Sequence, residues 1–229
     1  MRVFRKFLLA ELTWTTAIFL LIMPITILSG DLIDTSIHVR WLGRAIGLAA
    51  FPAGITVAGD IFAAPFRWRP LLFTLLATSL VALSVLGIFA FVVPVLGRQA
   101  TLAEVMLHMR SVTASWEVRN DAAWRLYSTL LSPVSTLLHA AIGVMVGVWA
   151  EYAMPSAFRR LLYWITGLGL LVSGYAVFDT TYESVVLHTT APVEFAAFYT
   201  LLVPLGICAG LGLPTLALVR GAEVRGSAT

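Results

Sequence analysis

The stretch LLFTLLATSLVALSVLGIFAFVVPVL, residues 71–96, contains no charged side chain. A helix of roughly 20 apolar residues crosses the hydrocarbon core of a bilayer. Lipid offers no partner to an unpaired backbone group, so such a segment must close its own hydrogen bonds as a helix. The stretch therefore predicts a membrane-spanning helix that stops close to Pro94, where the chain turns polar.

The whole chain has the same apolar character. Of its 229 residues, 59% are hydrophobic and 12% are charged, and the mean hydropathy is +0.92. That composition leaves too little polar surface to cover a soluble globule. The net charge is +3, but the basic residues fall in short clusters between apolar runs. This distribution is typical of membrane topology and gives no indication of a nucleic-acid partner.

Six apolar windows are long enough to cross a bilayer, so we predict one all-α transmembrane domain over residues 1–229. Basic residues gather at both chain ends and in the short loops after the second and fourth windows, which places both termini in the cytoplasm. The first window exceeds the apolar run of a signal peptide about twofold and is interpreted as a retained span. We expect a multi-pass protein of a bacterial cytoplasmic (inner) membrane. The windows are about 8–29, 42–64, 71–96, 125–149, 159–179 and 194–219.

The longest polar stretch, 97–124, separates the third and fourth windows. Thr101 and Glu104 form a T-x-x-E capping box, whose side chains bond backbone N–H groups at a helix start. Apolar residues follow at helical spacing, and Trp116 is typical of an interfacial anchor. We predict a short amphipathic helix on the outer membrane surface, with a disordered connector as the alternative. Its apolar residues are Leu102, Val105, Met106 and Met109.

Three motifs follow one another along the chain: RKFLLAE at 5–11, FVVPVLGR at 91–98 and AAWRLYSTLLSPVSTLL at 122–138. With these motifs the chain resembles the LptF/LptG (YjgP/YjgQ-like) family of lipopolysaccharide-export permeases. The resemblance implies six spans, a second permease-like half and a separate ATPase. The stretch 97–124 is too short for the periplasmic jellyroll of that family. The basic turn APFRWRP, residues 64–70, stands where the family has its cytoplasmic coupling helix.

Three ionisable side chains stand out within the predicted spans, where each costs about 2.5–3.5 kcal/mol on insertion scales. Glu11 lies near Arg5 and Lys6 in the chain and is interpreted as reaching the cytoplasmic interface. Asp60 is interpreted as pairing with an arginine of another helix, with cation binding or proton relay as alternatives. His139 is interpreted as making an interhelical hydrogen bond, with a pH response or axial metal ligation as alternatives.

Small residues one helical turn apart let helix backbones approach closely in lipid. Because His139 precedes Gly143 by one turn, its ring is predicted to lie on the same face and to point at another helix. The pairs that we predict to form packing faces are Gly143–Gly147, Gly169–Ser173 and Gly206–Gly210.

Catalytic and nucleotide-binding signatures are absent from the sequence. It has no G-x-x-x-x-G-K-[ST] phosphate loop, no G-x-S-x-G and no H-E-x-x-H. Its single cysteine, Cys208, excludes an intrachain disulfide and a cysteine metal cluster. We therefore predict a protein that is not an enzyme and that carries no metal or cofactor.

Two functions are compatible with these features. The first is a permease-like transmembrane subunit of a lipid (lipopolysaccharide-type) export system. Its partners would be membrane lipids, a second permease-like half and a separate ATPase, because the chain has no phosphate loop of its own. The second is a noncatalytic structural or accessory subunit of a larger membrane protein complex. The missing jellyroll and coupling helix favour this alternative, and fold alone does not decide between them.

Overall fold

The computed structural model describes residues 1–28, 35–62, 66–96, 116–153 and 203–227, and every element within these ranges is a helix. Among these described residues, four helices are long and apolar enough to cross a membrane: His38–Ile61, Trp68–Leu96, Ser132–Tyr152 and Pro204–Gly221. The described part of the chain is thus all-helical, and its apolar helices are those of a multi-pass membrane protein. The elements are α1 (Arg2–Leu28), α2 (Thr35–Ile61), α3 (Trp68–Gly87), η1 (Ile88–Val92), α4 (Val93–Leu96), α6 (Trp116–Ala153) and α9 (Val203–Ser227).

Four of the six predicted spans overlap candidate membrane helices of the described residues. The windows 42–64, 71–96, 125–149 and 194–219 overlap the four candidate spans. The window 8–29 is helical in α1, which is not among those four. The window 159–179 lies outside the described residues. The six-span arrangement therefore stays a prediction.

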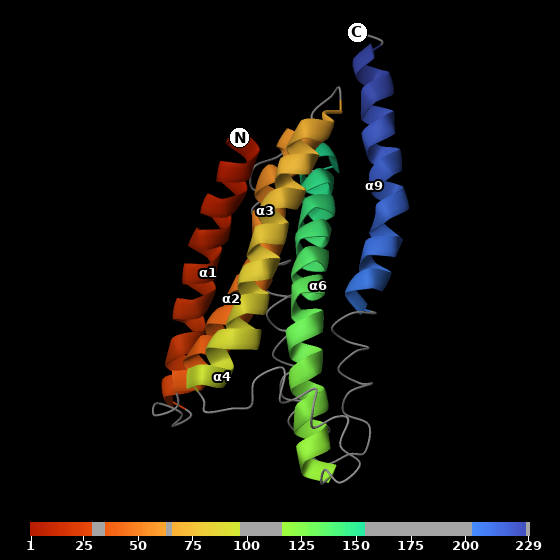
Figure 1. Cartoon of the computed structure of the whole chain (residues 1–229). Coiled ribbons are helices and arrows are strands. Elements are labelled where there is room, and N and C mark those ends of the chain that lie inside the picture. Colours follow the sequence, from red (N-terminus) through yellow and green to blue (C-terminus); the bar gives the residue numbers. More distant parts are fainter. Residues whose placement is uncertain (29–34, 63–65, 97–115, 154–202, 228–229) are drawn as a thin grey trace.

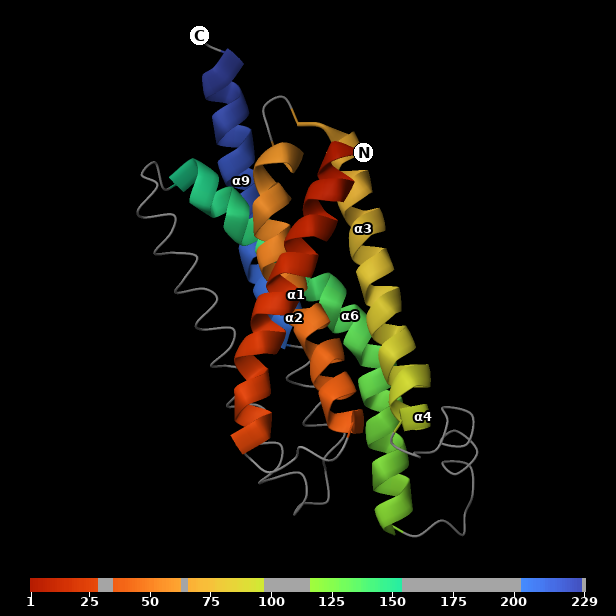
Figure 2. The same ribbon diagram turned by 90° about the vertical axis from the view of Figure 1, so that its left-hand side faces the viewer.

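The helices form an up-and-down bundle (Figure 1). α1 and α2 run in opposite directions, α3 reverses again, and α6 and α9 run parallel to each other. As a result, the start of α1 and the end of α9 lie at the same end of the bundle, which we call the terminal end. Figure 1 shows α1 and α9 on opposite sides of the molecule, and in Figure 2, turned by 90°, α1 lies in front and α9 behind.

α2 occupies the centre of the bundle. The main core cluster joins α1, α2, α3 and α6, and most of its α2 and α6 members are small or β-branched residues. In the candidate span of α2, 67% of the residues of its apolar window are buried, whereas in the span of α9 only 17% are. Among the described helices, α9 packs mainly on α6. Among the described helices, α9 therefore lies at the edge, and a large part of its surface is covered by no described residue. The core cluster consists of Val3, Phe7, Ala50, Ala53, Val57, Ile61, Ala77, Val81, Ala140 and Val144.

The third helix changes to a π-helix at η1, one turn before its end. The Val93 N–H donates to Ile88 O, five residues back, instead of the usual four. Pro94 has no N–H to donate to Ala90, and in a regular α-helix its ring would crowd that carbonyl group. The wider turn relieves this crowding. It also places Phe89 against α2, where a Cβ added at Gly43 would lie 2.8 Å from Phe89 Cε2.

The segment around the fourth predicted span differs from the expectation. α6 begins at Trp116 and continues without a break to Ala153. Trp116, expected as the anchor of a separate outer helix, is therefore the first residue of the long helix that also contains the span. The other residues of the predicted outer helix, Thr101, Leu102, Glu104, Val105, Met106 and Met109, lie outside the described ranges.

Candidate functional site

An ion pair joins the first two helices at the terminal end. Lys6 Nζ of α1 donates to Asp60 Oδ2 of α2 at 2.7 Å. The two side chains are 47% and 34% exposed, so solvent screens the pair, and such pairs contribute about 0–1 kcal/mol. The sequence predicts an arginine of another helix as the partner of Asp60. Its partner does come from another helix, but it is a lysine.

Glu11 is buried on the inward face of α1. It is 5% exposed, and neither carboxylate oxygen has a hydrogen-bond partner among the described residues. Phe7 and Thr15, one turn away on either side, are also buried, so this i, i+4 face is turned into the bundle. The side chain therefore points into the bundle and makes no described contact with Arg5 or Lys6, and its expected position at the interface stays a prediction.

His139 bonds within its own helix. Its Nδ1 lies 2.6 Å from Ser135 O and 3.2 Å from Ser135 Oγ, both one turn earlier in α6. A carbonyl oxygen only accepts, so the bond to Ser135 O assigns the hydrogen to Nδ1. This geometry differs from the expected hydrogen bond to another helix, because Ser135 at i−4 provides a nearer acceptor.

Backbones approach most closely where α2 and α6 cross. A Cβ added at Gly143 would collide with the backbone oxygen of Phe51, and one added at Gly147 would lie 2.5 Å from Ala58 Cβ. The same close approach is found from the side of α2, because a Cβ added at Gly54 would collide with Ala140 O of α6. We call these three glycines, which leave no room for a side chain, the α2–α6 seam.

The α2 half of this seam was missed in the sequence. Gly43, Gly47, Gly54 and Ala58 recur at intervals of four and seven residues, which places them on one face of α2. The last three face α6, whereas Gly43 faces Phe89 of η1. Gly47 faces Thr136 Oγ1, which would lie 3.2 Å from an added Cβ. The signal was therefore present, but Pro52 lies between the two pairs and obscures the repeat.

The glycine pair of α9 has different surroundings. No described atom lies within 4 Å of a Cβ built at Gly206 or Gly210. The opposite face of α9 is attached to α6, where Trp149 Nε1 donates to Thr215 Oγ1 at 3.0 Å. Gly206–Gly210 thus points away from α6, although its spacing equals that of Gly143–Gly147. The third predicted pair, Gly169–Ser173, lies outside the described residues.

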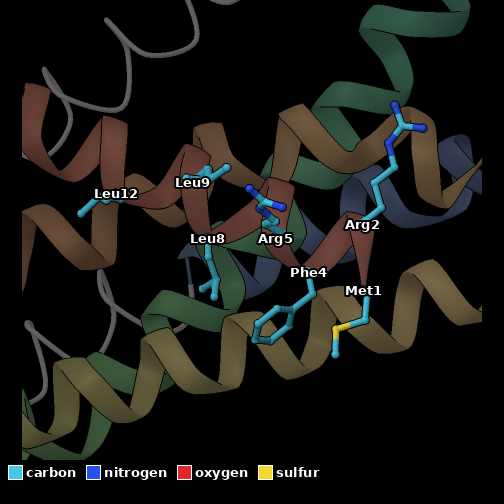
Figure 3. Close-up of a pocket in the computed structure, with 7 residues that line it drawn as sticks. All are labelled: Met1, Arg2, Phe4, Arg5, Leu8, Leu9 and Leu12. Carbon is cyan, nitrogen blue, oxygen red and sulfur yellow. The ribbon is translucent and has the colours of Figure 1, made fainter.

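A shallow pocket of about 700 Å³ runs along the outward face of α1 at the terminal end. Figure 3 shows that its side chains come from one helix: Arg2 and Arg5 extend on one side of α1, and Phe4 and Leu8 on the other. It is lined by Met1, Arg2, Phe4, Arg5, Leu8, Leu9 and Leu12, so it combines two cations with an apolar wall and contains no acidic residue.

Metal-ligating residues do not gather in the part of the chain that the structure describes: no three His, Cys, Asp or Glu side chains come together there. Cys208 is a free thiol, with Sγ 3.9 Å from Leu138 O.

Comparison of the chain with protein-family models, curated proteins and solved structures finds no match. The resemblance to the lipopolysaccharide-export permeases thus depends on the three motifs alone. What the protein does must be argued from its own geometry.

Proposed function

We propose that the chain is a permease-like transmembrane subunit of a lipid (lipopolysaccharide-type) export system in the bacterial inner membrane. A separate ATPase supplies the energy, and both termini lie in the cytoplasm. The observation that carries this proposal is the π-helix η1, which overlaps the motif FVVPVLGR. π-turns within α-helices are frequently found at functional sites.

The π-turn supports this function because it weakens one position of a spanning helix. A permease must open and close a path for lipid, and a helix bends where backbone hydrogen bonds are missing or displaced. Both conditions are met between residues 88 and 94: the Val93 N–H is shifted to Ile88 O, and Pro94 donates none. Phe89 packs on Gly43, so a change at the π-turn is transmitted directly to the central helix α2.

The test is a purification and an activity measurement with paired proline variants. The tagged chain is isolated from its native membrane in mild detergent, and the associated proteins are identified by mass spectrometry. We expect a P-loop ATPase and a second permease-like chain, with ATP hydrolysis stimulated by a lipopolysaccharide-type lipid in proteoliposomes. Pro94→Ala, which restores a backbone N–H next to η1, should lower this stimulation. Pro214→Ala restores an N–H in the exposed part of α9 and should not. Absence of any ATPase partner contradicts the proposal.

A second function is supported by the face of α9 that no described residue covers. Gly206 and Gly210 have no described neighbour, and Leu213 on the same face is 77% exposed. Small residues on an outward face permit a partner helix to approach closely. In a structural or accessory subunit this face docks on a larger membrane complex. The double variant Gly206→Leu/Gly210→Leu should then release the chain from that complex while its own unfolding midpoint stays unchanged. Retention of the complex by this variant contradicts docking through α9.

A further inference from the structure

The pocket on α1 carries positive charge at the terminal end of the bundle. Lys6 is already paired with Asp60, whereas neither Arg2 nor Arg5 forms an ion pair among the described residues. Both arginines are exposed, and no acidic residue lines the pocket. The pocket thus holds two positive charges that the described part of the chain leaves uncompensated.

The side chains that follow these arginines along the pocket are apolar. Leu9 and Leu12 are 55% and 65% exposed, on the same outward face. With a rise of 1.5 Å per residue, Leu12 lies roughly 10 Å along the helix from Arg5. A ligand that fills this pocket therefore has an anionic group at the arginines and an apolar chain extending from them toward the middle of the bundle.

We propose that this pocket binds an anionic glycerophospholipid, with its phosphate between Arg2 and Arg5 and an acyl chain along Leu9 and Leu12. Residues three apart on a helix are neighbours, and guanidinium groups bind phosphate oxygens through two parallel hydrogen bonds. The lipid headgroup is anionic because the lining offers no carboxylate to an amine-bearing headgroup. Membrane surfaces present such lipids to basic segments at the ends of spanning helices.

The site goes beyond the proposed function, since it operates in a permease and in a structural subunit alike. The test measures binding of phosphatidylglycerol and phosphatidylcholine to the full chain in detergent by native mass spectrometry. We expect selective retention of phosphatidylglycerol. Arg2→Gln/Arg5→Gln should weaken that binding about thirtyfold, which corresponds to about 1 kcal/mol for each arginine. The matched control Arg67→Gln/Arg69→Gln removes two exposed arginines at the same end and should bind as the unaltered chain does.

Two further arms separate the binding of a whole lipid from the binding of a free anion. Leu9→Ser/Leu12→Ser keeps every charge, and hence the topology signal, but removes the apolar wall, so it should also weaken binding of phosphatidylglycerol. Inorganic phosphate should not displace the lipid, because it lacks the chain. Equal retention of the two lipids, equal loss in the control, or displacement by inorganic phosphate would overturn the proposal. None of these results bears on the ATPase partner, so the two proposals fail separately.

Discussion

Two glycine pairs with the same spacing lie in opposite surroundings. Gly143 and Gly147 press against the backbone of α2, at the centre of the bundle. Gly206 and Gly210 lie on the face of α9 that is turned away from α6, with no described atom near them. The spacing shows only that a close approach is possible. Whether a helix approaches depends on where the segment lies in the bundle.

The largest effect is expected at the covered pair. In Gly143→Ala the new methyl group collides with Phe51 O, a backbone atom that moves only if α2 and α6 separate. Overpacking of this kind costs about 1–3 kcal/mol, and we expect the upper end of that range. Reversible unfolding in mixed detergent micelles measures the loss. A variant as stable as the unaltered chain would show that the seam is not close-packed.

Gly54→Ala tests the seam from the opposite helix. Its methyl group collides with Ala140 O, so we expect a loss of about 2 kcal/mol in the free energy of unfolding. Once α2 and α6 have moved apart to accommodate one methyl group, the second methyl group costs less free energy of unfolding. The double variant Gly54→Ala/Gly143→Ala should therefore lose less than the sum of the two single losses. Strict additivity in this cycle is the result that contradicts a shared crossing point.

Thr215→Val tests the face of α9 that is attached to α6. It removes the hydroxyl that accepts from Trp149 Nε1 but keeps the shape of the side chain. Hydrogen bonds between helices in membranes average about 0.6 kcal/mol, and we expect a loss of that size. Reversible unfolding in mixed detergent micelles measures this loss. A loss above about 2 kcal/mol would show that α9 is more firmly integrated than its burial indicates.

The smallest effect is expected at the uncovered pair. In the isolated chain, Gly206→Ala and Gly210→Ala place methyl groups where no described atom stands. The free energy of unfolding should change by no more than about 0.5 kcal/mol. The same unfolding assay gives a direct comparison with Gly143→Ala. Destabilisation equal to that of Gly143→Ala would mean that a neighbour packs on this face.

Helix positions were predictable from the sequence because apolar length is a property of the segment itself. The partners of individual residues were not, because they depend on neighbouring helices. Asp60 was expected to pair with another helix, and it does, but that the partner is Lys6 depends on how α1 packs against α2. For Glu11 the usable signal was Phe7 and Thr15 at i−4 and i+4, not the nearby cations. His139 was expected to bond to another helix, but Ser135 provides a hydrogen-bond acceptor on the same helix.

Pro94 was a visible signal, but its structural consequence was not predicted. The sequence indicated that the helix ends nearby, and it does end at Leu96. That the helix first changes its hydrogen bonding depends on the space available beside Gly43, which lies in another helix.

The π-turn at Ile88–Val92 also shifts the angular phase of the helix. One residue more than a regular turn is accommodated, so every side chain from Val93 onward is rotated by about 100° relative to an uninterrupted α-helix. The directions of the side chains of α4 are therefore set by one surplus residue inside this candidate membrane helix. Deletion of a single residue there would turn these side chains back by about 100° while leaving the apolar length almost unchanged.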